Sequence, residues 1–174
     1  MINKKNMLGV IAVVFMVLIS AVPTFAAQSS TQQVTVTVNP TVAISAAWNA
    51  GGNNSSISLA SDADNIQKTY SGEVVTDASN VNIDIYTRAT NFVGPDTFAL
   101  NNFMYSGGSV SSATVFTNNY AKICNNLTKP AATTTTPVPV TLYLTVPYGT
   151  GAGSYTNTVY FAAVQNGTAA PNTP

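Results

Sequence analysis

The ionisable side chains of this sequence are few, and they form no recognisable catalytic pair. The chain of 174 residues has six basic and six acidic residues and no histidine. Two carboxylates facing each other across a cleft could hydrolyse a glycosidic bond. The acidic residues are Asp62, Asp64, Glu73, Asp77, Asp84 and Asp96. Asp62 and Asp64 fall in one expected loop, and Asp84 falls on the polar face of an expected strand, so we expect these acids at a solvated surface.

The sequence also lacks the residues that nucleophilic catalysis usually requires. Serine is abundant, but a nucleophilic serine needs a neighbouring base. The sequence has no histidine and no Ser-x-x-Lys motif to supply one. We therefore predict no catalytic residue, no cofactor site and no enzymatic activity.

Metal ligands are equally sparse. The single cysteine, Cys124, and the lack of histidine exclude a structural zinc site. Asp62, Asp64 and Glu73 match positions 1, 3 and 12 of a calcium-binding loop, but Ile66 and Gln67 occupy a ligand position and the required glycine. We predict no metal site, although a different calcium site at these acids stays open. Cys124 is expected to be a small buried residue, with an intermolecular disulfide or a modified thiol as the alternative.

The composition excludes further classes of function. Charged residues make up 7% of the chain, against about 25% in an average soluble domain. So few Lys and Arg residues give no electrostatic surface for nucleic acid. Hydrophobic residues make up 45% of the chain, which argues against charge-driven disorder. A neutral globular chain rich in Ser, Thr and Asn remains.

The first 26 residues have the layout of a secretory signal peptide. Lys4 and Lys5 precede an apolar run over 7–22, and Thr24 and Ala26 are small residues before a cleavage point. A retained membrane anchor and a pilin-like leader cut after Gly9 are the alternatives. Cleavage after residue 26 would leave four basic and six acidic residues, a net charge of −2. The protein is therefore expected to be secreted, with membrane contact through this segment alone.

The rest of the chain reads as short strands. Alternating apolar residues occupy 34–38, 81–87 and 138–146, and further strands are expected at 42–48, 57–59, 70–76, 97–105, 113–117 and 154–164. Residues 118–137, which are polar and rich in threonine, are expected to form a long loop or an extended excursion that contains Cys124. Clusters of Gly, Asn, Ser and Pro separate these segments, and no helical periodicity is sustained. Eight to ten such strands predict an all-β antiparallel β-sandwich, immunoglobulin-like or jelly-roll-like, behind an N-terminal signal helix.

The most specific motif lies near the C-terminus. An apolar strand ends at Val146, and Pro147, Gly149, Thr150, Gly153 and Tyr155 follow at the spacing VPxGTxxGxY. This stretch resembles the terminal strand pair of prokaryotic surface immunoglobulin-like domains. Pro147 should end the strand, the glycines should allow positive φ, and the Tyr155 hydroxyl should bond back to the connection. The resemblance covers about 25 residues and implies a fold element, not an activity.

The layout as a whole resembles secreted subunits of donor-strand fibres, namely archaeal bundling pili and thread filaments and the bacterial TasA-type matrix proteins. The shared features are a leader, a polar start over 28–33, an alternating strand with Val34, Val36 and Val38, and a neutral sandwich without cysteine pairs. In those families the N-terminal strand of one subunit enters a groove of the next. The resemblance implies that role for these three valines. The alternative is that 34–38 forms the first strand of its own sandwich.

Four sites match the acceptor motif for N-glycosylation, at Asn53, Asn54, Asn126 and Asn166. All four fall in expected loops or at a strand end, where a sugar could be accommodated. A chain this rich in Asn, Ser and Thr also produces such motifs by chance.

Together these observations predict four regions: a signal peptide over 1–26, a tether and possible donor strand over 27–40, a β-sandwich over 41–166 and a flexible tail over 167–174. The predicted function is a secreted structural protein of the cell surface, a filament or pilus subunit that assembles with copies of itself. The alternative is a monomeric immunoglobulin-like adhesin or carbohydrate-binding module, whose partners would be glycans or other surface proteins.

Overall fold

The computed structural model describes residues 33–48, 58–131 and 134–172. The chain divides into two compact units, Met1–Thr37 and Val38–Pro174. The predicted signal helix and the polar residues 28–32 lie outside the described residues. Within the described ranges the only helical turn is a short 3-10 segment, Leu100–Asn102, and no helix there has the length and apolarity to cross a membrane.

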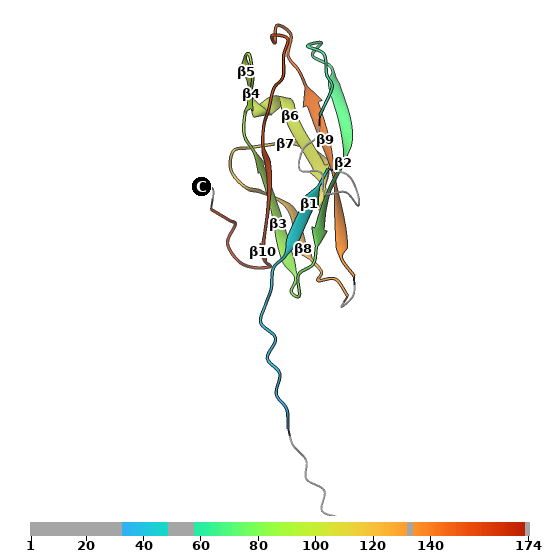
Figure 1. Ribbon diagram of the computed structural model, residues 1–174, viewed down its shortest axis with the longest axis vertical. Helices are drawn as coiled ribbons and strands as arrows, with labels where there is room; N and C mark the ends of the chain where they lie inside the picture. The colour runs from blue at the N-terminus through green and yellow to red at the C-terminus, as the bar shows by residue number, and fades with distance from the viewer. Residues whose placement is uncertain (1–32, 49–57, 132–133, 173–174) are drawn as a thin grey trace, which may run out of the picture. The chain divides into compact units, whose positions relative to one another are not determined.

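The second unit consists of antiparallel sheets (Figure 1). A five-stranded sheet has the order β1 (Ile44–Ala47), β2 (Gln67–Asp77), β9 (Thr136–Thr145), β6 (Phe103–Gly107) and β7 (Val110–Val115). A three-stranded sheet has the order β10 (Val159–Gln165), β3 (Ile83–Ala89) and β8 (Ala121–Leu127). A small hairpin is formed by two strands of two residues each, β4 (Phe92–Val93) and β5 (Thr97–Phe98). The predicted all-β antiparallel class is confirmed, and the arrangement is consistent with a β-sandwich.

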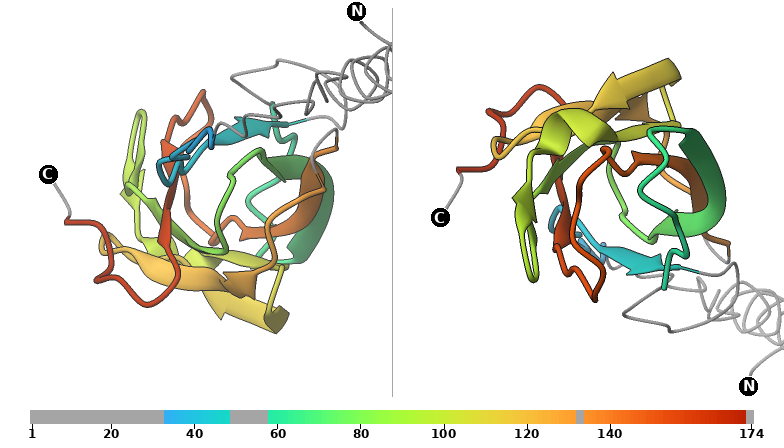
Figure 2. Two further views of the ribbon diagram at one scale, coloured as in Figure 1. Left: turned by 90° about the horizontal axis from the view of Figure 1, so that it is seen from below. Right: turned by 90° about the horizontal axis from the view of Figure 1, so that it is seen from above.

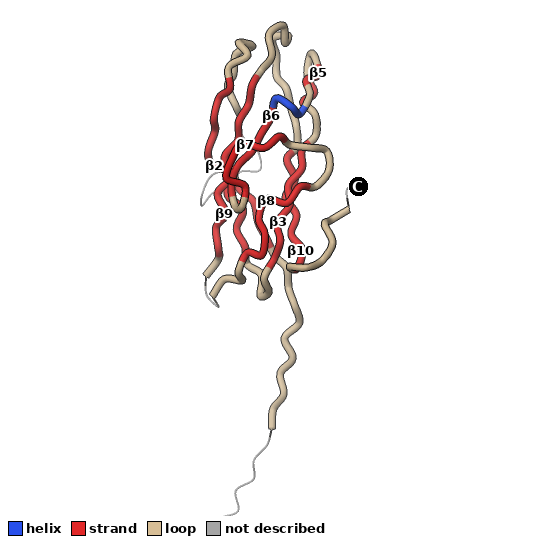
Figure 3. Tube along the Cα trace, turned by 180° about the vertical axis from the view of Figure 1, so that it is seen from behind, coloured by secondary structure: helices blue, strands red, loops and turns tan. Residues whose placement is uncertain are grey.

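Both larger sheets contribute to one apolar core. The views along the strands show the two sheets around a common interior (Figure 2). Val75, Val140 and Leu142 come from the wider sheet, and Ile85 and Ile123 come from the narrower one. Burying this surface is the main favourable term in folding. Figure 3 shows how little of the unit is helical.

Strand β9 follows its sequence pattern closely. Val138, Val140, Leu142 and Leu144 are all buried, while the residues between them are more exposed. Successive side chains of a strand point to opposite faces, so this alternation places one face of β9 on the core. The predicted strand over 138–146 is therefore confirmed within two residues at its start.

Strand β3 departs from its predicted pattern. The sequence predicts a half-buried strand with Asp84 and Tyr86 on a solvated face, but every residue from Ile83 to Ala89 is buried. The outer face is covered by long side chains of the flanking strands. The Arg88 guanidinium lies over the ring of Tyr160, 4.0 Å from its centroid, and the Lys122 ammonium lies 5.5 Å from that of Tyr86. Such cation–π contacts cover the outer face of β3 with charged and tyrosine side chains.

The predicted long loop over 118–137 is also wrong in part, because β8 lies within it. Its sequence, AKICNNL, has few β-branched residues and contains Asn126 at a φ of 50°. Ile123 and Cys124 nevertheless face the core, and the strand pairs with β3 through register shifts. Tertiary packing outweighs the weak local preference here.

Asp84 joins all three strands of the narrower sheet. Its carboxylate accepts hydrogen bonds from the Lys122 ammonium (2.8 Å), the backbone N–H of Asn126 (2.8 Å) and the side-chain amide of Asn166 (2.9 Å). Burial alone would raise the pKa of this carboxyl, but these donors outweigh it and hold the pKa at about 2. The ionised form is thus part of the fold, which corrects the expectation that Asp84 is merely solvated.

We predict that Asp84→Asn lowers the free energy of unfolding at pH 7 by about 2 kcal/mol, because a pKa depressed from 3.8 to about 2 stabilises the folded state by that amount. This stabilisation is complete above about pH 4 and is lost as the pH falls towards 2. Chemical denaturation across this range should show the wild-type and variant stabilities converging at the acidic end.

The matched control is Asp62→Asn, which removes a carboxylate that is 87% exposed and paired with Lys68. An exposed pair of this kind contributes little, so this variant should stay close to the wild type. Equal losses for the two variants would contradict the assignment of Asp84 as the ionic centre of the sheet.

Candidate functional site

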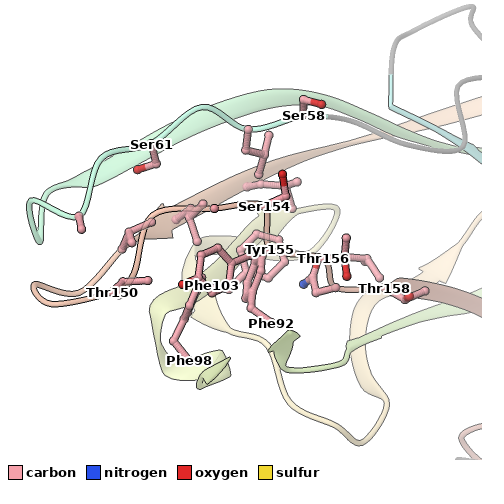
Figure 4. A pocket seen from close by; sticks show the side chains of 18 of the residues that line it. Ser58, Ser61, Phe92, Phe98, Phe103, Thr150, Ser154, Tyr155, Thr156 and Thr158 are labelled. Carbon is pink, nitrogen blue, oxygen red and sulfur yellow. The ribbon is translucent and has the colours of Figure 1, made fainter. Parts of the chain in front are cut away.

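A groove of about 880 Å³ opens between the two sheets (Figure 4). Its floor is made of core side chains, five of which are at most 9% exposed. They are Phe92, Phe98, Phe103, Leu142, Leu144 and Val146. One wall is the segment 58–63, and the other is the C-terminal segment from Thr150 to Phe161. The site is therefore apolar at its base and bordered by backbone and small polar side chains.

The groove exists because β1 is short. Its four residues pair with Val74–Asp77 at one end of β2. Residues 67–73 of β2 pair with β9 on one side, and in the described part of the chain no strand pairs with them on the other. Ala46 and Trp48 stand at the near end of the groove, where β1 stops. A strand of four residues covers only about 13 Å, so no described part of β1 reaches along the first half of β2.

The edge strand β10 offers free backbone groups to the groove. Thr158 accepts a hydrogen bond from Thr90, and Asn166 donates one to Asn82, so these residues face β3. Backbone groups of an antiparallel strand alternate between its two edges. Those of Val159 and Phe161 therefore point to the opposite edge, where no strand is found among the described residues. The side chains of the same two residues pack against the core.

The predicted corner motif closes one end of this wall. Strand β9 ends at Thr145, and the Pro147 carbonyl accepts hydrogen bonds from Thr150. Gly149 has a φ of +80°, which disfavours other residues. The Tyr155 hydroxyl donates to the Gly151 carbonyl at 2.7 Å, which is the bond back to the connection that the sequence leads us to expect.

Two contacts that the sequence does not reveal complete the corner. The Asp96 carboxylate, at the tip of the β4–β5 hairpin, accepts the backbone N–H of Gly151 at 2.7 Å. A side chain at Gly153 would come within 2.5 Å of Pro95, so the hairpin and the connection fit only with glycine there. The predicted strand over 154–164 accordingly starts later, at Val159, and its first part forms a single bridge between Thr156 and Val93.

The predicted donor residues lie in no strand. Val34, Val36 and Val38 are 83%, 77% and 74% exposed, and residues 33–43 carry no strand assignment. The structure thus gives no support to the alternative that 34–38 is the first strand of its own sandwich.

The glycosylation motifs fall at different kinds of position. Asn53 and Asn54 lie outside the described residues. Asn126 and Asn166 are exposed, but both belong to the Asp84 cluster, and the Asn166 amide nitrogen that would carry a sugar donates to Asp84. Modification at these two sites stays a prediction, and at Asn166 the sugar would have to share that nitrogen with the hydrogen bond.

In the described ranges, no group of three potential metal ligands is found among the acids and Cys124. Asp62 and Asp64 lie 3.1 and 3.9 Å from the Lys68 ammonium. The side chain of Glu73 lies outside the described part. Asp77 is fully buried and its Oδ1 accepts the backbone N–H of Ser79, which corrects the expectation of a solvated position.

Cys124 is 6% exposed and packs in the core, as its predicted role as a small buried residue requires. Burial raises the pKa of its thiol, with the Ser109 hydroxyl 4.0 Å away acting in the opposite direction. A protonated, buried thiol is a poor nucleophile. The intermolecular disulfide is therefore not supported by the position of this residue.

The floor of the groove was not predicted as a site. Its aromatic residues form a continuous series in which Tyr155 contacts Phe98, Phe98 stacks on Phe92, and Phe92 contacts Phe103. The sequence identifies such residues only as core candidates. Which of these aromatic residues line the groove depends on where β1 ends, and no local sequence pattern indicates that position.

Comparison with known proteins adds no relative: no protein-family model matches the chain, and no curated protein matches it.

We predict that Tyr155→Phe lowers the free energy of unfolding by about 1 kcal/mol, because it removes the hydrogen bond to Gly151 and leaves the ring in place. Thermal denaturation measures the change. Tyr148→Phe is the control, since that ring is 75% exposed on the same connection. Identical melting temperatures for the two variants would show that the hydroxyl does not hold the corner.

Proposed function

We propose that this protein is a secreted structural subunit of the cell surface that polymerises by β-strand donation. The observation that supports this most is the pairing of two incomplete features. One is a groove with a core-like floor beside an unpaired strand edge. The other is an extended segment whose alternate valines are exposed. The groove lacks a strand to pair with its edge, and the extended segment lacks a sheet to pair with.

The groove needs an occupant of a particular kind. A free strand edge invites pairing with another chain, and partly buried apolar side chains beside it, such as Val159 and Phe161, can be buried further. An added strand would satisfy both, because its main chain bonds to the edge while alternate side chains enter the groove. A rounded small molecule would cover the floor but would leave the edge of β10 unpaired.

The segment 34–38 has the properties of such a strand. Five residues span about 17 Å, and the alternation of Val34, Val36 and Val38 with two threonines places three apolar side chains on one face. β-branched residues also favour the extended conformation. The valines would fill the groove, and the threonines would face solvent.

The donor must come from a second copy of the chain. Asn80 holds residues 39–41 of its own chain, since its side chain bonds to the Asn39 carbonyl (2.9 Å) and the Thr41 N–H (2.7 Å). This fixed point is next to the Asp77 end of β2, and the groove begins beside Tyr70, seven residues or about 23 Å back along that strand. The four residues from Val38 back to Val34 span only about 13 Å, so they do not reach the groove of their own chain. A neighbouring subunit has no such restriction.

The surface chemistry agrees with close self-association. A chain with 7% charged residues has little repulsion between copies. Export through the signal segment, location at the cell surface and glycosylation of exposed Asn residues complete the proposal. The immunoglobulin-like assignment of the sandwich also belongs to it, since the Tyr155 corner is the feature that favours this class.

The alternative function is a monomeric adhesin or carbohydrate-binding module. The aromatic floor is the observation that favours it, because aromatic rings also bind sugars and apolar ligands. A monomeric module, however, is expected to pair its N-terminal strand within its own sandwich. The lack of strand structure over 33–43 therefore favours the polymer.

We predict that Val36→Asp abolishes polymers of the secreted protein, lowering the polymer mass at least about tenfold, because a carboxylate cannot enter the apolar groove. The monomer should keep its melting temperature, since Val36 is 77% exposed. Sedimentation and negative-stain electron microscopy measure assembly, and circular dichroism measures folding.

Thr35→Asp is the matched control, with the same charge one residue away on the face that should point to solvent. It should assemble like the wild type. If Val36→Asp also forms wild-type filaments, strand donation is wrong. If the wild type stays a monomer that binds sugars, the alternative function holds instead.

A further inference from the structure

We propose that the donated strand lies antiparallel to β10, with Val38 at the mouth of the groove, Val34 at its deep end and Asn157 at the mouth fixing the register. This inference rests on the proposed function. It adds the direction and register of the strand, and thereby the polarity of the polymer.

The direction of the donor strand follows from where it leaves one subunit and where the groove of the next subunit lies. Asn80 fixes the chain at Asn39, next to the end of β2 at Asp77. The groove lies along the other half of β2, where Leu142 and Leu144 pair with Tyr70 and Lys68. The point where a donor strand leaves its own subunit and the groove that receives one are thus at opposite ends.

The described residues leave the groove open to a tethered strand at one end. The acceptor's own β1 ends the groove at Ala46 and Trp48 and contacts β10 there. The donor's body therefore has to lie beyond the other end, next to the Gly149–Tyr155 connection. Val38 is the valine nearest that body, so it stays at the mouth and Val34 reaches farthest in.

This order fixes the orientation against β10. The strand β10 runs from Val159, on the mouth side, towards Gln165, which pairs with Ile83 beyond the groove. The donor runs from Val34 at the deep end to Val38 at the mouth, in the opposite sense. Antiparallel pairing with Val36 opposite Val159 places Val34 opposite Phe161 and Val38 opposite Asn157. All six side chains then face the interior.

An unpaired polar group in the wall supports an incoming main chain. Asn157 lines the groove, and its side-chain nitrogen is sealed from solvent and has no hydrogen-bond acceptor among the described residues. Buried polar groups are normally hydrogen-bonded, so such an exception needs a reason. A rotation of the Asn157 side chain would let this amide donate to a carbonyl oxygen of the donor strand at the mouth. A shift by one residue would turn the valines away from the groove.

A polymer built this way is open and polar. Each subunit donates at one end and accepts at the other, which is a head-to-tail contact between different surfaces. Such contacts do not limit the number of subunits. One terminal subunit keeps an empty groove, and the other keeps a free donor strand.

Paired cysteines test the direction. In the full chain with Cys124→Ala, Thr37→Cys with Thr158→Cys should form disulfide-linked dimers and ladders on oxidation. Both residues would face solvent as directly opposed neighbours whose Cα atoms are closely spaced. Thr35→Cys with Thr158→Cys is the matched pair that a parallel strand would link, and it should give at least tenfold less product.

The outcomes separate the two levels of the proposal. Filaments with preferential linkage of residues 35 and 158 would overturn the antiparallel arrangement while leaving strand donation intact. No filaments and no linkage in either pair, with the Cys124→Ala background also monomeric, would overturn strand donation itself. Mass spectrometry of the linked peptides identifies the pairs.

Asn157→Asp tests the register. It keeps the size of the side chain and replaces its donor with an acceptor, so it should slow filament growth about tenfold in solutions near neutral pH. Asn157→Gln retains the donor and should recover part of the rate. The isolated subunit should keep its melting temperature in both variants. Equal growth rates for Asn157→Asp and the wild type would show that this amide has no part in strand capture.

Discussion

Burial of one aromatic core between two sheets of unequal width is the constraint on which the rest of this structure depends. Five strands face three, and β1 at the edge of the wider sheet has only four residues. Among the described residues, no strand pairs with the first half of β2 on the side away from β9. The groove lies there, next to core side chains that are themselves almost fully buried.

The edge of the groove is held firmly by polar contacts. Asp84 ties together β3, β8 and the end of β10, so the strand that borders the groove is fixed in the narrower sheet. The hydrogen bonds of Tyr155 and Asp96 with Gly151 hold the other part of the same wall. A wall fixed at both ends would lower the entropic cost of binding a strand, because little of its backbone would have to be ordered.

Local patterns allowed the class of the fold to be predicted, and long-range pairing decided what the sequence missed. The alternation over 138–146 and the Tyr155 corner are local, and both are found as expected. Strand β8 and the buried Asp84 and Asp77 depend on neighbours distant in the sequence. The exposed valines at 34–38 show the same limit, because strict alternation is equally typical of a strand in its own sheet and of one that pairs elsewhere. Only the position of β1 distinguishes the two.

The central claim is that the groove of one subunit is filled by residues 34–38 of another. High-resolution cryo-electron microscopy of the assembled secreted protein tests it most directly. The account predicts uniform filaments in which each groove holds an extended segment continuous with the next subunit, with Val34, Val36 and Val38 on the aromatic floor. A protein that stays monomeric at high concentration, or filaments whose grooves are empty, would contradict it.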